Sequence, residues 1–295
     1  MTEAPTRPVL RYHGGKWRLA PWVISYLPEH RIYVEPFGGA ASVLLRKPAC
    51  FSEIYNDLDE DVVNLFRILR LPDQADKLLS LLELTPFARR EFEAAYTPAS
   101  DAIERARSLI VRSFMGFGSD APNIELRTGF RAQSPNSGRA PEKDWLNYVP
   151  ALRLIIARLR EVVIECRPAI DVILKNDGPQ TLHYVDPPYM PETRSQKSGR
   201  GRLKYHAYAH EMTVEDHSDL LSVLNALHGM VVLSGYRSKL YDASLKNWKR
   251  FEIKAMADGA RPRTECLWLN PAAFEQWDAD IREAVSQPCM FAEAL

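Results

Sequence analysis

YVEPFGGAAS at residues 33–42 indicates the class of fold more clearly than any other segment. A β-branched run ends at Glu35, and a Gly-Gly pair separates it from a run of helical character that starts at Ala40. Glycine permits positive φ angles and a close approach of backbone to ligand, and doubly wound sheets bind ligands where a strand gives way to a helix. Asp57 lies 19 residues after Gly38, near the offset at which an acid binds ribose hydroxyls. We expect a nucleoside-containing cofactor at this junction, with an ordinary structural turn as the alternative.

The rest of the chain continues this alternation of strands and helices. Short β-branched or apolar runs predict buried strands at residues 32–35, 51–56, 162–166, 181–186, 230–236, 250–256 and 264–270. Helical patterns occupy residues 16–27, 40–47, 59–70 and 213–227, the last with Thr213 and Asp216 in capping-box spacing. Strands that alternate with helices indicate an α/β fold with a mainly parallel sheet covered on both faces.

One region interrupts the alternation. Between about residues 71 and 148 the pattern predicts helices, at 73–82, 86–95 and 100–114, but no strand, and residues 116–145 are rich in Gly, Pro, Ser and Asn. An irregular segment of that length is usually functional or disordered. The sequence therefore predicts a core made of residues 1–70 and 150–295 and a mostly helical insertion at residues 71–149, which ends in an irregular arm.

The composition is that of an ordinary globular protein. The 295 residues carry 38 basic and 38 acidic side chains, so the net charge alone does not indicate a nucleic-acid partner and only local patches matter. No apolar run approaches the roughly 20 residues that span a bilayer, and the N-terminus lacks a secretory-signal core. We therefore expect a cytoplasmic protein without a membrane partner. The four cysteines form no CxxC pair, and residues 206–217 do not have HExxH spacing, so we expect no metal site.

A second motif, DPPY at residues 186–189, directly follows a predicted strand. An adenine N6 is a poor nucleophile because its lone pair is delocalised into the ring. The Asp186 carboxylate and the Pro187 carbonyl are two acceptors that can bond both hydrogens of such an amine and localise the lone pair. A proline ring fixes φ and aims the carbonyl, and Tyr189 offers a face for an extruded base. The motif predicts a catalytic site formed by Asp186, Pro187, Pro188 and Tyr189, because a plain Pro-Pro turn would not require the flanking Asp and Tyr.

A third motif, YHGGKW, lies near the N-terminus at residues 12–17. A Gly-Gly turn that leads into a helix places Lys16 and free N–H groups where a carboxylate can bind. Taken alone, the motif is explained equally well as an ordinary helix start.

Together, in this order, the three motifs resemble the Dam-type (alpha-group) family of site-specific DNA adenine-N6 methyltransferases. SFMGFG at residues 113–118, residues 205–217 and RTECLWLN at residues 263–270 match the family as well, so the resemblance covers about residues 10–272. It implies a Rossmann-like class I methyltransferase core with a seven-stranded, mostly parallel sheet. It also implies transfer of a methyl group from S-adenosyl-L-methionine to the N6 amino group of an adenine that is flipped out of double-stranded DNA.

The resemblance also implies roles for individual residues. Tyr12 and Lys16 would border the methionine end of the cofactor, Asp57 would bind its ribose hydroxyls, and Asp186 would face both cofactor and target amine. The full set of implied cofactor-binding residues is Tyr12, Gly15, Lys16, Phe37, Gly38, Gly39, Asp57 and Asp186.

For DNA, the resemblance implies that the helical insertion is the target-recognition domain and that its arm enters the major groove. Arginine bonds guanine edges in a bidentate manner, so Arg127, Arg131 and Arg139 are candidates for guanine or phosphate contact. A basic stretch after the DPPY motif, with Arg194, Lys197 and Arg200, lies where related enzymes cover the flipped base and its phosphates. For each of these residues a solvated side chain is the alternative.

Other acceptors and a non-catalytic role are the competing hypotheses. Related motifs usually begin with Ser for cytosine N4 and with Asn for a protein glutamine, so Asp186 favours adenine, and the insertion favours DNA over RNA. A DNA-binding regulator without catalysis is a further alternative, which the intact Lys16, Asp57, Asp186 and Tyr189 argue against.

The chain departs from the family at CRPA, residues 166–169, where relatives often carry an acid near the cofactor adenine and where this chain has none before Asp171. That departure puts the contacts to the cofactor adenine in doubt. The sequence leaves open whether the protein acts as a monomer or a homodimer. It also leaves open whether the protein has a cognate restriction endonuclease or works alone.

Overall fold

The computed structural model describes residues 4–118, 122–124, 127–132, 140–190, 210–257 and 261–286. Within them, seven strands form one sheet with the order β3-β2-β1-β4-β5-β7-β6. The strands are β1 Ile32–Glu35, β2 Ser52–Asn56, β3 Val162–Glu165, β4 Thr181–Val185, β5 Met230–Gly235, β6 Lys249–Ala257 and β7 Arg261–Leu269. Strands β1 to β5 pair in parallel, and β7 pairs antiparallel with both β5 and β6. The predicted α/β fold with a mostly parallel sheet is confirmed.

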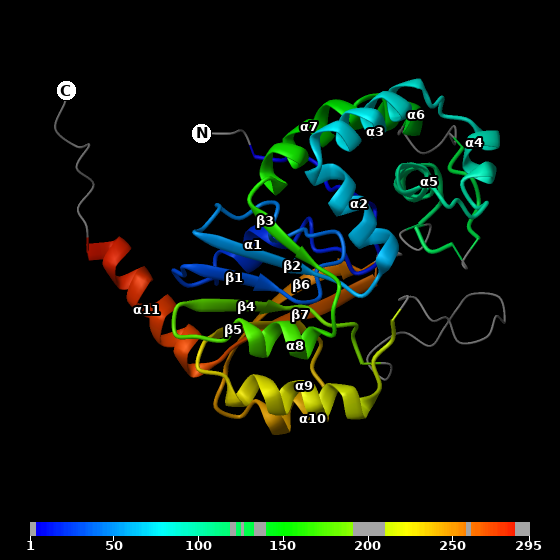
Figure 1. Cartoon of the computed structure of the whole chain (residues 1–295). Coiled ribbons are helices and arrows are strands. Elements are labelled where there is room, and N and C mark those ends of the chain that lie inside the picture. Colours follow the sequence, from blue (N-terminus) through cyan, green and yellow to red (C-terminus); the bar gives the residue numbers. More distant parts are fainter. Residues whose placement is uncertain are drawn as a thin grey trace, which may run out of the picture.

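Helices cover both faces of this sheet, and the alternation of side chains along the strands explains how (Figure 1). On β5, Val231 and Leu233 belong to one apolar cluster with residues of α9 Val214–Ala226, whereas Val232 belongs to the cluster on the other face. On β7, Cys266 and Leu267 alternate in the same way. Helices α8 Ala169–Lys175 and α10 Lys239–Ser244 lie on the α9 side (Figure 1). The remaining core helices are α1 Ala20–Ile24, α2 Glu60–Arg70 and α11 Pro271–Ser286.

A lobe of helices lies beside the β3 end of the sheet (Figure 1). It contains α3 Pro72–Leu84, α4 Arg89–Ala94, α5 Ala102–Met115, α6 Pro141–Leu146 and α7 Tyr148–Leu159. Helix α2 contacts both β3 and α5 and so joins the lobe to the sheet. Leu78, Ile110 and Leu152 of the lobe share one buried cluster with Tyr33 and Leu182 of the sheet. The lobe is therefore inserted in the sequence but packs against the same apolar core.

An arm leaves the lobe after α5, and its base is held by backbone pairing. Phe117 N donates to Gly129 O at 2.8 Å and Arg131 N donates to Met115 O at 2.7 Å, around a single bridge between Gly116 and Phe130. No strand is assigned between residues 71 and 148 in the described part of the lobe, as the sequence predicts.

Local signals explain where the well-predicted helices begin. The Asp59 side chain accepts from the N–H groups of Asp61 and Val62 at the start of α2, as an N-cap residue does. Thr213 and Asp216 form the predicted capping box at the start of α9. None of the helices in the described ranges is both long and apolar enough to cross a membrane.

Two predicted helices are wrong in extent. The helix predicted at residues 16–27 is limited to α1, with Pro21 in its first turn and Leu19 as its N-cap. The helix predicted at residues 40–47 is a series of turns. There Gly39 and Ala41 have φ angles of 47° and 51°, and the N–H of Leu44 donates to the buried Glu35 carboxylate instead of to a helical carbonyl.

Five helices were not predicted, namely α6, α7, α8, α10 and α11. Helix α6 occupies the end of the stretch that was predicted to be irregular and starts at Pro141, a residue that suits the first turn. The predicted boundary at residues 149/150 falls inside α7.

Candidate active site

The ends of β1, β2 and β4 bring three acids to one edge of the sheet. Glu35 ends β1, Asp57 follows β2, and Asp186 follows β4, and neighbouring parallel strands end at the same edge. They line a cavity of about 570 Å³, a volume typical of small-molecule sites. All eight predicted cofactor-binding residues line it: Tyr12, Gly15, Lys16, Phe37, Gly38, Gly39, Asp57 and Asp186.

The N-terminal motif forms a tight turn on the wall of this cavity. Gly15 N donates to Tyr12 O at 3.1 Å, and Gly14 has a φ of 71°, as a glycine in the third position of a type II turn does. A Cβ at Gly15 would lie 3.0 Å from the Tyr12 carbonyl oxygen, a tight contact that favours glycine there too. Lys16 follows directly and is buried, with 7% of its surface exposed.

Lys16 and Asp186 form an ion pair, with 3.0 Å between Nζ and Oδ2. Burial alone lowers the pKa of a lysine, but the negative charges of Asp186 and Glu265 outweigh it, so the pKa of Lys16 lies above its ordinary value. Burial raises the pKa of Asp186, and Lys16 opposes that rise. The second oxygen of Asp186, Oδ1, is buried and has no hydrogen-bond partner within the described residues. The lysine thus holds one oxygen, and the other is a buried acceptor that Lys16 does not bind.

The loop after β1 is shaped by its two glycines. A Cβ at Gly38 would overlap the ring of Tyr55, whose hydroxyl donates to Gly39 O at 2.7 Å. Asp57 accepts from Gly39 N through Oδ2 at 2.7 Å and from Asp59 N through Oδ1 at 2.8 Å. Burial raises the pKa of Asp57, and these backbone hydrogen bonds oppose that rise. The carboxylate is therefore fixed in the cavity wall, and each oxygen keeps a lone pair for a ligand hydroxyl.

Glu35 is a buried acid whose part in the site was not predicted. Its Oε2 accepts from the Tyr33 hydroxyl at 2.8 Å and from Leu44 N at 3.0 Å. Burial raises the pKa of Glu35 to about 8, despite those two hydrogen bonds. The group is therefore mostly protonated at neutral pH and shapes the cavity floor as a neutral acid.

Asn56 is a second residue that the sequence analysis missed. Its amide nitrogen donates to Pro36 O at 2.9 Å and to Arg167 O at 3.0 Å, while its side-chain oxygen accepts from Arg167 N at 2.9 Å. It therefore ties the loop after β1 to the segment after β3. Its position directly before Asp57 is the only signal in the sequence that pointed to it.

The segment that departs from the family pattern lies on the cavity wall. Pro168, Ala169 and Ile170 line the cavity, as does Leu58, which directly follows Asp57. Asp171 does not line it and instead lies 3.8 Å from Arg167 in an exposed ion pair. The acids that line the cavity from the other helix on this face, α9, are Asp216 and Asp219.

Pro187 and Pro188 line the cavity but Tyr189 does not, and only 8% of the Tyr189 surface is exposed. The Tyr189 hydroxyl donates to Oε2 of the buried Glu265 at 2.7 Å. The Lys16 ammonium lies 4.6 Å from the centroid of the Tyr189 ring, and the ring of Tyr236 lies 4.5 Å away at an angle of 66°. The four residues of the predicted catalytic motif are thus adjacent, with Tyr189 behind the cavity wall.

Two of the predicted DNA-contacting arginines are described. Arg127 is exposed and lies over the ring of Tyr96, 5.2 Å from its centroid. Arg131 is largely buried and pairs with Asp144 at 3.2 Å. Arg139, Arg194, Lys197 and Arg200 lie outside the described residues.

The histidines near α9 do not gather around a metal in the described ranges, where no group of three or more metal-ligating side chains occurs. His217 is buried, and its Nδ1 lies 3.1 Å from the Tyr241 hydroxyl. His210 and Glu211 line the cavity, and His206 lies outside the described residues.

Comparison with known families identifies the arrangement. Residues 12–258 match the model of the D12 class N6 adenine-specific DNA methyltransferase family. The chain belongs to this family. The resemblance that the motifs indicated is thereby confirmed, and the seven-stranded sheet with its covering helices is the class I methyltransferase fold.

Curated relatives of this D12 family member are DNA adenine methylases. The Vibrio cholerae serotype O1 protein is 24% identical over 193 residues, which cover 63% of this chain and 66% of the relative. The Escherichia coli K12 protein is 24% identical over 245 residues, covering 79% and 82%. The Salmonella typhi protein is 24% identical over 219 residues, covering 72% and 73%. The chain thus spans about two thirds of the Vibrio relative and more of the other two.

Proposed function

We propose that this chain transfers a methyl group from S-adenosyl-L-methionine to the N6 amino group of an adenine flipped out of double-stranded DNA. The observation that carries the proposal is how the two carboxylate oxygens of Asp186 are bonded. One oxygen is held by Lys16 at 3.0 Å, and the other is a buried acceptor without a partner among the described residues, at the edge of the cavity. An N6 amine needs such an acceptor, and membership of the D12 family names the same acceptor base.

The charges of the cavity suit this cofactor. Lys16 is the single lysine or arginine among the described residues that line it, whereas Asp57, Asp59, Asp186, Asp216 and Asp219 are acids. A site of that kind attracts a cation and repels a pyrophosphate. S-adenosyl-L-methionine carries a sulfonium and an ammonium group and, when bound, supplies an electrophilic methyl group. The cavity volume of about 570 Å³ also suits a ligand of this size.

Each part of the cofactor has a matching group. Lys16 and the turn at Gly14 and Gly15 suit the carboxylate at the methionine end, since they supply a cation and backbone N–H groups. Asp57 suits the ribose hydroxyls. Leu58 and Ile170 are apolar side chains that suit the faces of the adenine ring. Asp216 and Asp219 of α9 are candidate acids for the edge of that ring, because the segment after β3 has none in the cavity wall.

Asp186 would act on the target amine through hydrogen bonding and charge. Oδ1 would accept one N6 hydrogen and the carbonyl of Pro187 the other, so that the lone pair turns out of conjugation with the ring. Lys16 fixes the orientation of the carboxylate by binding Oδ2. Transfer leaves a positive charge on N6 until one hydrogen departs as a proton, and the carboxylate stabilises that charge.

The inserted lobe at residues 71–149 would be the target-recognition domain. Its arm begins at the Gly116–Phe130 bridge, and Arg127 is exposed beside that bridge. An exposed arginine stacked on an aromatic ring is presented with little freedom, which suits a contact with a guanine edge or a phosphate. Arg131 forms an ion pair with Asp144, so its role would be structural, in fixing the base of the arm.

A transfer assay with defined acceptors tests the proposed function. Purified protein is incubated with S-adenosyl-L-methionine labelled in the methyl group and with duplex DNA or RNA, and the product is digested to nucleosides and separated. We expect label in N6-methyldeoxyadenosine from DNA. Label in N4-methylcytosine, or in RNA alone, would overturn the assignment of the acceptor. No transfer from protein shown to bind the cofactor and DNA would favour a regulator instead.

A further inference from the structure

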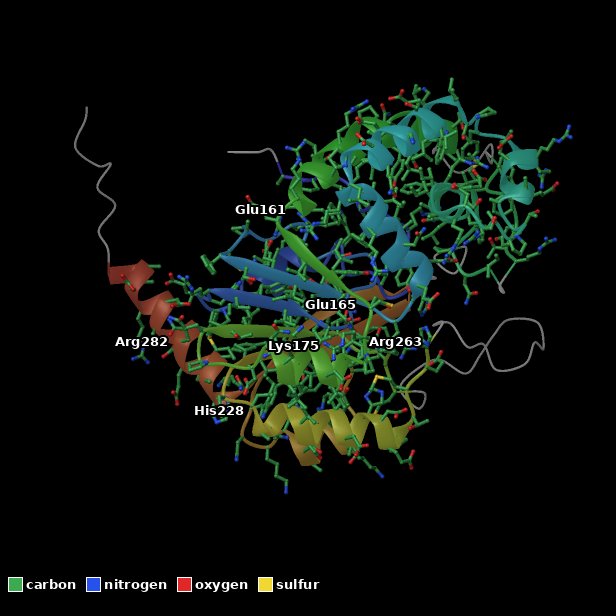
Figure 2. All side chains as sticks on the ribbon, in the orientation of Figure 1. Glu161, Glu165, Lys175, His228, Arg263 and Arg282 are labelled. Carbon is green, nitrogen blue, oxygen red and sulfur yellow. The ribbon has the colours of Figure 1, made fainter. Side chains whose placement is uncertain are left out.

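The hydroxyl of Tyr189 is bound by the carboxylate of Glu265, which has no assigned role. Glu265 lies on β7, and only 7% of its surface is exposed. The antiparallel register pairs Gly235 with Cys266, so the next residues, Tyr236 and Glu265, lie side by side at the edge of the sheet where β4 ends. Figure 2 shows the neighbouring Arg263 on the side of the molecule that faces the helical lobe, opposite to Arg282 and His228.

Glu265 lies between two tyrosines. Its Oε2 accepts from the Tyr189 hydroxyl at 2.7 Å, and its charge acts on the neighbouring Tyr236. Burial and the charge of Glu265 raise the pKa of Tyr236, so this phenol stays a hydrogen-bond donor. The Ser234 hydroxyl, at 3.5 Å from the Tyr189 hydroxyl, is a weaker partner. A tyrosine ring turns about two bonds, and its hydroxyl oxygen lies on the axis of the second, so the hydrogen bond fixes the direction in which the ring points.

Burial of a carboxylate at this position is energetically unfavourable by itself. Taking a carboxylate out of water is unfavourable unless its oxygens receive hydrogen bonds and its charge is compensated. At Glu265 a hydrogen bond comes from the Tyr189 hydroxyl, and Lys16 supplies the nearby positive charge. The arrangement links strand β7 to the catalytic motif through Tyr189, and not through a direct contact with the cavity, which Glu265 does not line.

Resting on the proposed function, we propose that Glu265 is a positioning residue for methyl transfer. Its hydrogen bond to the Tyr189 hydroxyl holds the ring against the Lys16 ammonium, which lies 4.6 Å from the ring centroid and binds Asp186. The hydrogen bond carries the effect, and the negative charge does not. A glutamine has an oxygen in the same place and keeps the bond, whereas an alanine loses it.

The test compares Glu265→Ala, Glu265→Gln and Tyr189→Phe by the single-turnover rate of transfer to duplex DNA at saturating cofactor. We expect a rate roughly 10- to 100-fold lower for Glu265→Ala, and a rate within about threefold of the parent for Glu265→Gln. In the Tyr189→Phe background, Glu265→Ala should change the rate by less than about threefold, because the bond is already absent. Glu252→Ala is the matched control, since Glu252 lies on the paired strand β6 and is 40% exposed.

Two further measurements separate positioning from loss of structure. The cofactor dissociation constant and the melting temperature of Glu265→Gln should match those of the parent. A Glu265→Gln rate as low as that of Glu265→Ala, or fully multiplicative effects of Tyr189→Phe and Glu265→Ala, would overturn the inference. An inactive parent protein would instead overturn the proposed function itself.

Discussion

Asp57 and Asp171 are acids that follow neighbouring strands, and they differ in what surrounds them. Asp57 lines the cavity and is fixed by two backbone N–H groups, whereas Asp171 is exposed beside Arg167. We expect Asp57→Ala to raise the cofactor dissociation constant roughly 10- to 100-fold, because hydrogen bonds to a charged group contribute about 1.5 to 3 kcal/mol each. Titration calorimetry with S-adenosyl-L-methionine measures this directly. Asp171→Ala should leave the constant unchanged, and equal effects of the two variants would contradict the assignment.

Glu35 should make the stability of the fold depend on pH. Its pKa is about 8 in the folded protein and has an ordinary value of 4.5. Between these values the folded state holds a proton that the unfolded chain has lost, so the free energy of unfolding falls as pH rises, by up to about 1.4 kcal/mol per unit. Glu35→Gln removes this contribution.

Urea denaturation of the parent and of Glu35→Gln from pH 5 to pH 9 measures the difference. We expect the stability of the variant relative to the parent to increase up to about pH 8 and then to level off. A difference that stays constant across this range would show that Glu35 does not hold its proton.

The motifs predicted residues that line the cavity but not those that hold them in place. Lys16, Asp57 and Asp186 line it together, and it was the combination of the three motifs that pointed to them. Glu35 and Asn56 are important through burial and partners, such as the bonds from Asn56 to Arg167, more than 100 positions along the chain. Pairings of that kind are set by the packed sheet, and sequence spacing does not reveal them.

At the scale of elements, the loop between β1 and β2 depends on a close approach of the Gly38 backbone to the ring of Tyr55. A Cβ at Gly38 would overlap the ring of Tyr55, while a Cβ at Gly129 would meet nothing within 4 Å. We therefore expect Gly38→Ala to lower the melting temperature by several degrees, as overpacking by roughly 1 to 3 kcal/mol does, and to weaken cofactor binding. Differential scanning calorimetry on Gly38→Ala and on its control Gly129→Ala tests this. Equal melting temperatures would show that the loop adapts.

The arm offers a second prediction at this scale. Arg127→Ala should weaken binding to duplex DNA containing the target by roughly 5- to 150-fold if the side chain reads a base. The dissociation constant of the cofactor should be unchanged. Fluorescence anisotropy at fixed salt measures it. Arg282→Ala is the control, because Arg282 is on α11, on the opposite side of the molecule from the lobe (Figure 2). An Arg127→Ala affinity equal to that of Arg282→Ala would remove the residue from the interface.

Helices were predicted well where capping residues mark their ends. They were predicted poorly where tertiary contacts determine whether a segment is helical. The Thr213 capping box and the Asp59 cap fixed α9 and α2 within a residue. At residues 40–47 the apolar spacing is helical, but the Glu35 side chain takes the N–H of Leu44 and the segment remains a series of turns. That competition depends on a buried carboxylate from another element, which no local pattern contains.

At the scale of the whole molecule, the order of the strands follows from the fold class more than from any one motif. Strands β4 and β5 were recognisable as buried apolar runs, and alternation with helices implied a parallel sheet. The antiparallel placement of β7 between β5 and β6 was not predicted, because the resemblance implied only a seven-stranded, mostly parallel sheet. The inserted lobe was predicted as a break in the alternation, but the core that it shares with the sheet was not.

The proposed function rests on one reaction, the methylation of adenine N6 through Asp186. The most direct test is single-molecule sequencing of DNA from a methylation-free host that expresses this chain or its Asp186→Ala variant. We expect N6-methyladenine at one defined sequence with the parent chain and none with the variant, because Oδ1 of Asp186 is the buried acceptor for the amine. Unmodified adenine in cells that contain folded, cofactor-binding parent protein, or equal methylation by the variant, would contradict the account.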